Sequence, residues 1–428
     1  MVSSPRPYPP DGGRPVGPAH RYARLDNGVQ VVGVPLPNPS VCFALYLGSG
    51  SMHEPAELNG ITHVIEHLFF KGSRRRSGAE LAEVGAALGA EANAFTWHLG
   101  VCCHARVLRR HWAACLDLLV EQMTEPEFTE PDWAAERPVV LHEKARMEAN
   151  PKVVAIQAVM TARYPDHPLG RPVVGTDATL ARIRVADVRR YFERILRPDR
   201  LTLVVAGGFD WERVYQAARQ ALSGLSARTD PVPAPPPVPE PVCGMTVQHT
   251  GAFPNVHLAY GIPVPGYRDP DYFAGQLLGT VLGDETRTSS RLLLRVQQRD
   301  LAHDVFAAYQ AFHEDGIIYT YAATTPDRAG AAHRAVLDEF GRLGDIEPDE
   351  LHRACRKLVS RIAVDGETSQ KRALAAARLF TGSGRLDTLE QLTERFRAVT
   401  VADLHRLVAT YRPERSWVGV AFGPLSTL

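Results

Sequence analysis

The chain has 428 residues, of which 45% are hydrophobic and 22% are charged, an ordinary balance for a soluble globular protein with more than one core. Its 48 basic and 48 acidic residues give a formal net charge of zero, which argues against a nucleic-acid partner. No apolar run reaches membrane-spanning length, so we expect no membrane partner. The start of the chain lacks the apolar core of a secretory signal, and we therefore expect a cytoplasmic protein.

The first elements are predicted from local signals. Residues 1–20 are rich in proline and glycine and are expected to be a disordered lead-in. Residues 22–34 predict a β-hairpin, because Asn27-Gly28 is a strong turn signal between two apolar stretches. The unbroken apolar run 41–47 predicts a buried strand.

After the loop that precedes Gly60, the pattern of apolar residues predicts both helices and strands. Further elements are expected at these positions: helices from about 60, at 77–89, 111–125, 131–149 and 185–196, and strands within 91–105 and at 201–206. Pro131 suits the first turn of its helix, whereas Pro138 is expected to kink or restart that helix.

A proline-dense segment divides the chain. Residues 227–242 favour extended polyproline II and predict a linker between an N-terminal domain, 21–226, and a C-terminal domain, 243–428. The halves also resemble each other: the order helix, Arg-Pro-acid-Arg, strand occurs around Arg197–Arg200 and again around Arg412–Arg415. We therefore expect duplicated α+β units.

A possible metal site lies in the motif His63-Val-Ile-Glu-His67. On a helix, His63 and His67 lie one turn apart on the same face, with Glu66 beside them. Two imidazoles and a carboxylate suit a zinc ion, and His-x-x-Glu-His is one of the zinc-peptidase signatures. The alternative is a set of ordinary helix residues, and spacing alone leaves the third ligand open among His, Asp, Glu and Cys.

Several segments in the same order resemble those of one enzyme family. His63–Gly72 is similar to the signature of the pitrilysin, or M16, zinc peptidases, and Glu136–Glu143 is similar to the segment that ends in their third ligand. Glu91–Thr96 resembles the strand beside the metal in these peptidases, and His167–Thr176 resembles another characteristic segment of the family. The resemblance implies two homologous α/β-sandwich halves, each with a mainly antiparallel sheet covered by helices. It points to the shorter, M16B-type subunits that pair into peptidases, among them the mitochondrial processing peptidase.

The resemblance also implies roles for individual residues. His63, His67 and Glu143 would bind one Zn²⁺ per chain, Glu66 would be the general base for a zinc-bound water, and Glu136 would be a second acid near the ligands. An extended peptide would add as a strand along the segment Asn93, Ala94, Phe95, Thr96. The implied function is that of a zinc-dependent endopeptidase subunit that cleaves flexible peptides or leader sequences in a two-subunit clamshell.

The second half departs from the family pattern. Gln297 stands where an arginine is expected and His303 where a tyrosine is expected; in the family these two residues hold the substrate backbone and stabilise the intermediate. Arg295 and His303 remain candidate substrate contacts. The missing pair implies a heterodimer, in which a homologous subunit supplies the arginine and the tyrosine.

Other readings stay open at this point. The chain is alternatively a non-catalytic assembly subunit, although such family members usually lose ligands or the base. His98 and His142 are weaker ligand candidates. The substrate, its cleavage site and the pathway are not readable from the residues.

Overall fold

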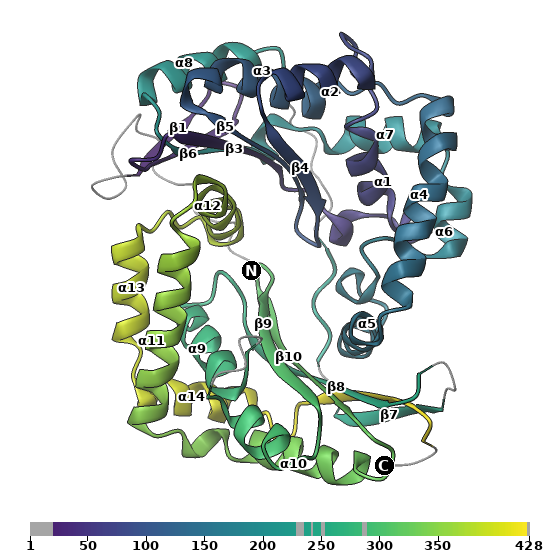
Figure 1. The fold of residues 1–428 in the computed structure, drawn as a ribbon, viewed down its shortest axis with the longest axis vertical. Helices are drawn as coiled ribbons and strands as arrows, with labels where there is room; N and C mark the ends of the chain where they lie inside the picture. The colour runs from purple at the N-terminus through teal and green to yellow at the C-terminus, as the bar shows by residue number, and fades with distance from the viewer. Residues whose placement is uncertain (1–19, 228–234, 241–242, 250–252, 285–288, 426–428) are drawn as a thin grey trace. The chain divides into compact units, whose positions relative to one another are not determined.

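The computed structural model describes residues 20–227, 235–240, 243–249, 253–284 and 289–425, which form two compact units (Figure 1). Unit 1 contains the described residues up to Leu141 and those within 173–234 and 363–390. Unit 2 contains those of 142–172, 235–362 and from Gln391 onward. The expected lead-in lies outside the described residues apart from His20. Of the expected linker, residues 227 and 235–240 are described and carry no regular secondary structure.

Unit 1 is built on a six-stranded sheet in the order β1-β2-β6-β3-β5-β4. Its only parallel neighbours are β2 and β6, and the other pairs are antiparallel. The strands span Arg21–Arg24 (β1), Gln30–Pro35 (β2), Ser40–Leu47 (β3), Glu91–Thr96 (β4), Val101–Leu108 (β5) and Leu201–Gly207 (β6).

Helices cover both faces of this sheet, because alternate strand residues are apolar on each side. Phe43 and Leu45 pack in the main core, whereas Cys42 and Ala44 pack against α12. Figure 1 shows α3 and α8 over one face and α12 against the other. The helices of this unit are α1 (Ile61–Leu68), α2 (Gly78–Ala87), α3 (Trp112–Thr124), α4 (Glu130–Glu148, whose last turns lie beyond Leu141), α6 (Asp177–Arg182), α7 (Val185–Ile195), α8 (Trp211–Leu222) and α12 (Ser369–Ser383).

Unit 2 repeats the same strand arrangement. Its five-stranded sheet has the order β7-β11-β8-β10-β9, again with one parallel pair, β7 with β11. The expected α+β architecture of two homologous sheet-and-helix halves is therefore confirmed. The elements are β7 (Gly244–His249), β8 (Val256–Pro265), β9 (Asp304–Ala311), β10 (Asp315–Thr324), β11 (Val418–Gly423), α5 (Pro151–Arg163), α9 (Tyr272–Leu282), α10 (Ala329–Gly341), α11 (Pro348–Asp365), α13 (Leu389–Ala398) and α14 (Val401–Tyr411).

Each unit contains a helix from the other half of the sequence. Helix α5 follows α4 in the chain but packs on β8, β10 and β11 of unit 2. Helix α12 comes late in the chain but packs on β2, β3, β5 and β6 of unit 1. The face of each sheet is thus completed by a segment that is distant in sequence.

The elements predicted from local signals are found in the structure, and one prediction about them needs a correction. The hairpin around Asn27-Gly28 is present as β1 and β2, and strand character at 91–105 resolves into the hairpin β4–β5. Of the two outcomes expected at Pro138, a kink or a restart of the helix, the restart is wrong, because α4 runs unbroken from Glu130 to Glu148. Pro138 is exposed, while Trp133 and Val140 on either side of it are buried and hold the helix together. Among the described helices, none has the length and apolar character needed to cross a bilayer.

Candidate metal centre

Helix α1, which carries the His-x-x-Glu-His motif, begins at a tightly constrained point. Gly60 precedes it with φ +95°, and a Cβ there would lie 2.7 Å from the Cα of Gly175. Only glycine meets both conditions without strain. This close approach gives a structural reason for Gly175, the next-to-last residue of the family-like segment His167–Thr176.

The buried carboxylate of Glu54 caps the same helix end. It accepts hydrogen bonds from the backbone N–H groups of Gly60, at 2.7 Å, and Thr62, at 2.8 Å, and from the amide of Asn59 at 3.0 Å. These bonds satisfy N–H groups that have no partner within the helix. Burial raises the pKa of Glu54, and the hydrogen bonds from Gly60, Thr62 and Asn59 only partly offset that effect.

The motif residues share one face of α1. The ring centroids of His63 and His67 lie 4.6 Å apart, with an angle of 74° between the ring planes. His63 is buried, and Glu66 and His67 are partly exposed. The expected proximity of the two imidazoles is therefore present in the structure.

Glu143 reaches the same place from α4. The ligand atoms of His63, His67 and Glu143 all lie within 4.8 Å of one another, which no other group of three His, Cys, Asp or Glu residues matches among the described residues. Neither His98 nor His142 belongs to the group. Unit 1 ends inside α4 at Leu141, but the helix is continuous, so its buried turns around Val140 fix where Glu143 lies.

A second carboxylate on α4 orients one imidazole. Oε1 of Glu136 lies 2.9 Å from Nδ1 of His67, and its other oxygen pairs with Nζ of Lys71. Burial alone would raise the pKa of Glu136, but the hydrogen bonds from Lys71 and His67 outweigh it and hold that pKa below its ordinary value. An ionised Glu136 favours the His67 tautomer that leaves Nε2 available as a ligand atom.

The neighbouring strand β4 forms the edge of the unit 1 sheet. Thr96 donates its hydroxyl hydrogen bond to Oε2 of Glu66, so the end of β4 lies directly beside the motif helix. The four residues predicted to contact a peptide, Asn93, Ala94, Phe95 and Thr96, all belong to this edge strand.

The remaining candidates lie in unit 2. Arg295 is half-exposed, with its guanidinium 3.8 Å from a carboxylate oxygen of Glu339. The Gln297 amide donates to the backbone carbonyl of His303 at 3.2 Å, and His303 itself is exposed. Glu339, the partner of Arg295, and His303, the partner of Gln297, both lie within unit 2.

The donor set fits zinc better than the alternatives. Two imidazole nitrogens and one carboxylate leave a fourth position open, which is the composition of catalytic zinc sites, whereas calcium and magnesium prefer all-oxygen sets. Sequence reasoning missed Glu54 and Lys71. For Lys71 a signal existed, because it follows His67 at a spacing of four residues.

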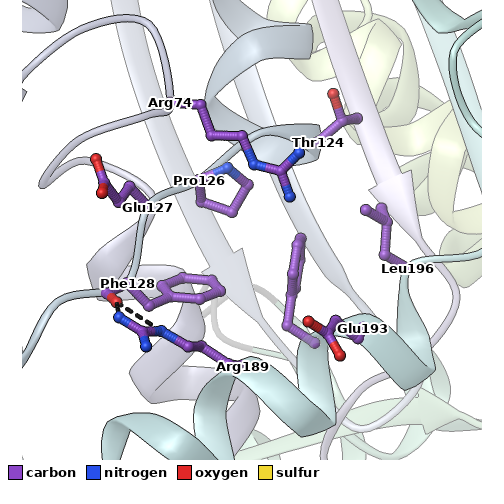
Figure 2. A pocket seen from close by; sticks show the side chains of 9 residues that line it. Arg74, Thr124, Pro126, Glu127, Phe128, Arg189, Glu193 and Leu196 are labelled. Atoms are coloured by element: carbon purple, nitrogen blue, oxygen red, sulfur yellow. Dashed lines mark hydrogen bonds between the residues drawn. The ribbon is translucent and has the colours of Figure 1, made fainter.

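A separate surface pocket of about 600 Å³ lies elsewhere in unit 1 (Figure 2). Phe128 and Phe192 form an apolar part of its wall, and Arg189 donates to the carbonyl oxygen of Phe128, with Nε at 2.9 Å. Arg74 and Glu193 add charges of opposite sign. None of the pocket's lining residues belongs to the metal group.

Comparisons with known proteins give consistent results. Residues 33–177 match the family described as "Insulinase (Peptidase family M16)", and residues 182–358 match the one described as "Peptidase M16 inactive domain". An uncharacterized zinc protease of Streptomyces coelicolor is 30% identical over 349 residues, which cover 79% of this chain and 75% of that protein. The beta subunit of the mitochondrial-processing peptidase of Saccharomyces cerevisiae is 27% identical over 96% of this chain and 92% of the subunit.

A solved structure supports the fold. The crystal structure of a protease from Helicobacter pylori superposes with a TM-score of 0.87, at 22% sequence identity, over 95% of this chain and 99% of that one. At this level of identity the similarity establishes the shared architecture alone.

Proposed function

The chain belongs to peptidase family M16, and from this premise we propose that it is the metal-bearing subunit of a zinc-dependent endopeptidase. The observation that carries the proposal is the meeting of His63, His67 and Glu143 ligand atoms within 4.8 Å, beside Glu66. Relatives named as zinc proteases support the same reading.

In this proposal His63, His67 and Glu143 hold one zinc ion, which when bound polarises the peptide carbonyl and makes water more acidic. Glu66 is the general base: its carboxylate takes a proton from water as the oxygen joins the carbonyl carbon. The C–N bond then breaks, and Glu66 returns that proton to the leaving amine. The hydroxyl of Thr96 orients the Glu66 carboxylate for both transfers.

The substrate is proposed to be a flexible peptide that lies along β4. An edge strand presents backbone N–H and C=O groups that no neighbouring strand pairs. An extended peptide can pair with them, as in other cases of β-augmentation. The position of Thr96, bonded to Glu66 at the end of the strand, supports a path that leads toward the motif helix. Leader sequences are peptides of this kind.

We further propose that the chain works with a homologous subunit. Gln297 and His303 stand where an arginine and a tyrosine would complete the site, and neither of them offers the same charge and hydroxyl chemistry. The yeast relative is named as a subunit, which agrees with paired assembly. Activity of this chain as a homodimer, without a second polypeptide, would contradict this part.

The experiment that tests the proposal is Glu66→Gln, assayed in the assembly that the chain forms in its own cells. We expect zinc content and folding close to those of the unaltered protein and a loss of peptide turnover of at least about 100-fold, the contribution of a general base. Glu57→Gln, at an exposed position before α1, is the matched control and should keep full turnover. Turnover retained by Glu66→Gln would overturn the mechanism. A protein that folds, lacks zinc and lacks turnover would instead be a non-catalytic assembly subunit.

A further inference from the structure

The face of β4 turned away from the motif helix carries a second set of side chains. Thr96 points to Glu66 on the α1 side, and neighbouring residues of a strand point to opposite faces. Phe95 accordingly packs on the other face, against the cluster that contains α12. A peptide added to β4 would therefore meet the metal residues with one set of side chains and the Phe95 side with the alternate set.

Arg378 of α12 lies over this second face. Its guanidinium carbon is 5.2 Å from the ring centroid of Phe95 and 5.2 Å from that of Trp97. The indole of Trp97 is itself fixed by a hydrogen bond from Nε1 to the Tyr46 hydroxyl at 3.1 Å. The two rings hold the cation by cation–π attraction and limit its motion.

The charge of Arg378 is available to a ligand. The side chain is exposed, and no carboxylate of the described residues forms an ion pair with it. Helix α12 has no acidic residue between Ser369 and Ser383, and its Lys371 is paired with Asp365 at 2.5 Å. No carboxylate on this helix therefore competes with a ligand for Arg378.

The register of β4 determines which peptide residue reaches this place. The N–H of Trp97 donates to the carbonyl of Gly100 at 2.9 Å, so Trp97 belongs to a hydrogen-bonded pair. Hydrogen-bonded and non-hydrogen-bonded pairs alternate along an antiparallel ladder, so Phe95, two residues away, is also in a hydrogen-bonded pair and its backbone groups point toward β5. Those of Ala94 and Thr96 point to the open edge. The Ala94 N–H is bonded to Oδ1 of Asn93 at 2.8 Å, as expected for a donor outside the ladder. A peptide residue opposite Phe95 would have its side chain on the α12 face, with Cβ atoms about 5 Å apart.

We propose that Arg378, held by Phe95 and Trp97, is a side-chain subsite that selects an acidic residue at one position of the bound peptide. The proposal rests on the proposed peptidase function and names its substrate class: flexible peptides with an Asp or Glu on the α12 face of the added strand. A guanidinium preorganised by two rings forms charge-assisted bonds to a carboxylate with little further loss of freedom.

The test uses the assembly that the chain forms in its own cells, with fluorogenic peptides that differ only in carrying a single Glu, or the isosteric Gln, at successive positions around the cleaved bond. The unaltered protein should prefer Glu by about tenfold in kcat/KM at one position, with no such preference at the positions on either side of it, whose side chains face α1. Arg378→Gln should abolish that preference, so that the ratio of kcat/KM for the Glu and Gln peptides is about one. Arg378→Lys should keep part of the preference. Arg219→Gln, an exposed arginine on α8 at the opposite face of the sheet, is the matched control and should change nothing. A preference that is absent, or that persists in Arg378→Gln, overturns the subsite.

A binding measurement separates the subsite from the peptidase function. Fluorescein-labelled Glu and Gln peptides are titrated with the full chain as Glu66→Gln, with and without Arg378→Gln, and followed by anisotropy. A Glu preference in binding that depends on Arg378, without cleavage by the assembly that the unaltered chain forms in its own cells, would retain the subsite and overturn the peptidase. Cleavage without a Glu preference would retain the peptidase function and overturn the subsite. Neither cleavage nor a binding preference would overturn both.

Discussion

The imidazole of His67 is held by a chain of charged groups. Glu136 accepts from its Nδ1, and Lys71 neutralises the other oxygen of the same carboxylate. The arrangement fixes the ring before any metal arrives. In this view Glu136 is a positioning residue for the metal group.

We predict that Glu136→Gln weakens zinc binding by about 10- to 100-fold, because a neutral amide holds His67 less firmly and no longer attracts Lys71. Competition with a chromogenic chelator measures the zinc dissociation constant directly. Glu130→Gln, at an exposed site on the same helix, is the control and should bind zinc normally. Equal affinities for the two variants would show that Glu136 does not position His67.

Local periodicity predicted part of this group and left the rest open. His63, Glu66 and His67 share a face because 3.6 residues make one helical turn, which is a property of α1 alone. The nearness of Glu143 depends on how α4 packs, and its assignment came from the family resemblance. Lys71 acts through Glu136 of a distant helix, so its spacing of four residues from His67 was the only local signal for it, and the cap by Glu54 depends on a loop conformation that no residue pattern specifies.

Helix α1 has only eight residues, from Ile61 to Leu68, and depends on its surroundings. So short a helix is marginal by itself in water. Burial of Ile61, Val64, Ile65 and Leu68 in the main core and the Glu54 cap together hold it in place. The geometry of the metal group therefore depends on these supports.

Glu54→Ala should destabilise the protein by about 2 kcal/mol, because it leaves three buried donors at the start of α1 without their acceptor. Urea unfolding followed by circular dichroism gives this difference. Glu57→Ala removes an exposed carboxylate three residues away and should change stability by less than about 0.5 kcal/mol. If the two variants were equally stable, the cap would have no energetic role.

Strand β8 contains a titrating group that makes unit 2 sensitive to acid. His257 is buried, with Nδ1 2.9 Å from the Tyr321 hydroxyl. Burial, and secondarily the charge of His303, lower the pKa of His257 to about 4 from its usual 6.5. The folded state thus keeps His257 neutral at pH values where the unfolded chain binds a proton.

It follows that falling pH costs stability between about 6.5 and 4, by at most about 3 kcal/mol from this group. Urea midpoints at pH 7 and pH 5 should fall more for the unaltered protein than for His257→Phe, which has no proton to bind. His352→Asn, an exposed histidine, is the control and should behave like the unaltered protein. The same pH dependence in His257→Phe would contradict the assignment.

Element prediction succeeded where the signal was local. The Asn27-Gly28 turn determines the β1–β2 hairpin by its own backbone preference, whatever the rest of the chain does. The restart expected at Pro138 does not occur, because tertiary packing of Trp133 and Val140 outweighs the local cost of a proline within the helix.

The exchange of helices between sequence halves shapes the stability of the entire protein. Without α12, the unit 1 sheet would expose Val32, Val34, Ala44 and Val204, all fully buried or nearly so. Exposed apolar surface of this kind promotes aggregation. We therefore expect that neither half of the sequence is a complete folding unit.

We predict that residues 21–226 expressed alone aggregate or bind a hydrophobic dye, because their sheet lacks α12. Coexpression with residues 243–428 should restore a cooperatively folded complex that size-exclusion chromatography resolves from aggregates. A monodisperse 21–226 fragment that unfolds as cooperatively as the full chain would contradict this.

The repeated Arg-Pro-acid-Arg segments correctly predicted duplicated architecture, since both lead into corresponding strands, β6 and β11. No comparable sequence feature predicted that α5 packs on the unit 2 sheet and α12 on the unit 1 sheet. The sequence of neither helix indicates which sheet it covers, because that is decided by contacts distant in sequence.

The central claim is that His63, His67 and Glu143 hold a zinc ion, and the zinc content of the purified chain tests it most directly. Inductively coupled plasma mass spectrometry should find about one zinc per chain in the unaltered protein, as expected for a site with three protein ligands. The variant with both His63→Ala and His67→Ala should be folded and nearly free of zinc. No zinc in the unaltered protein, or equal zinc in the two proteins, would contradict the account.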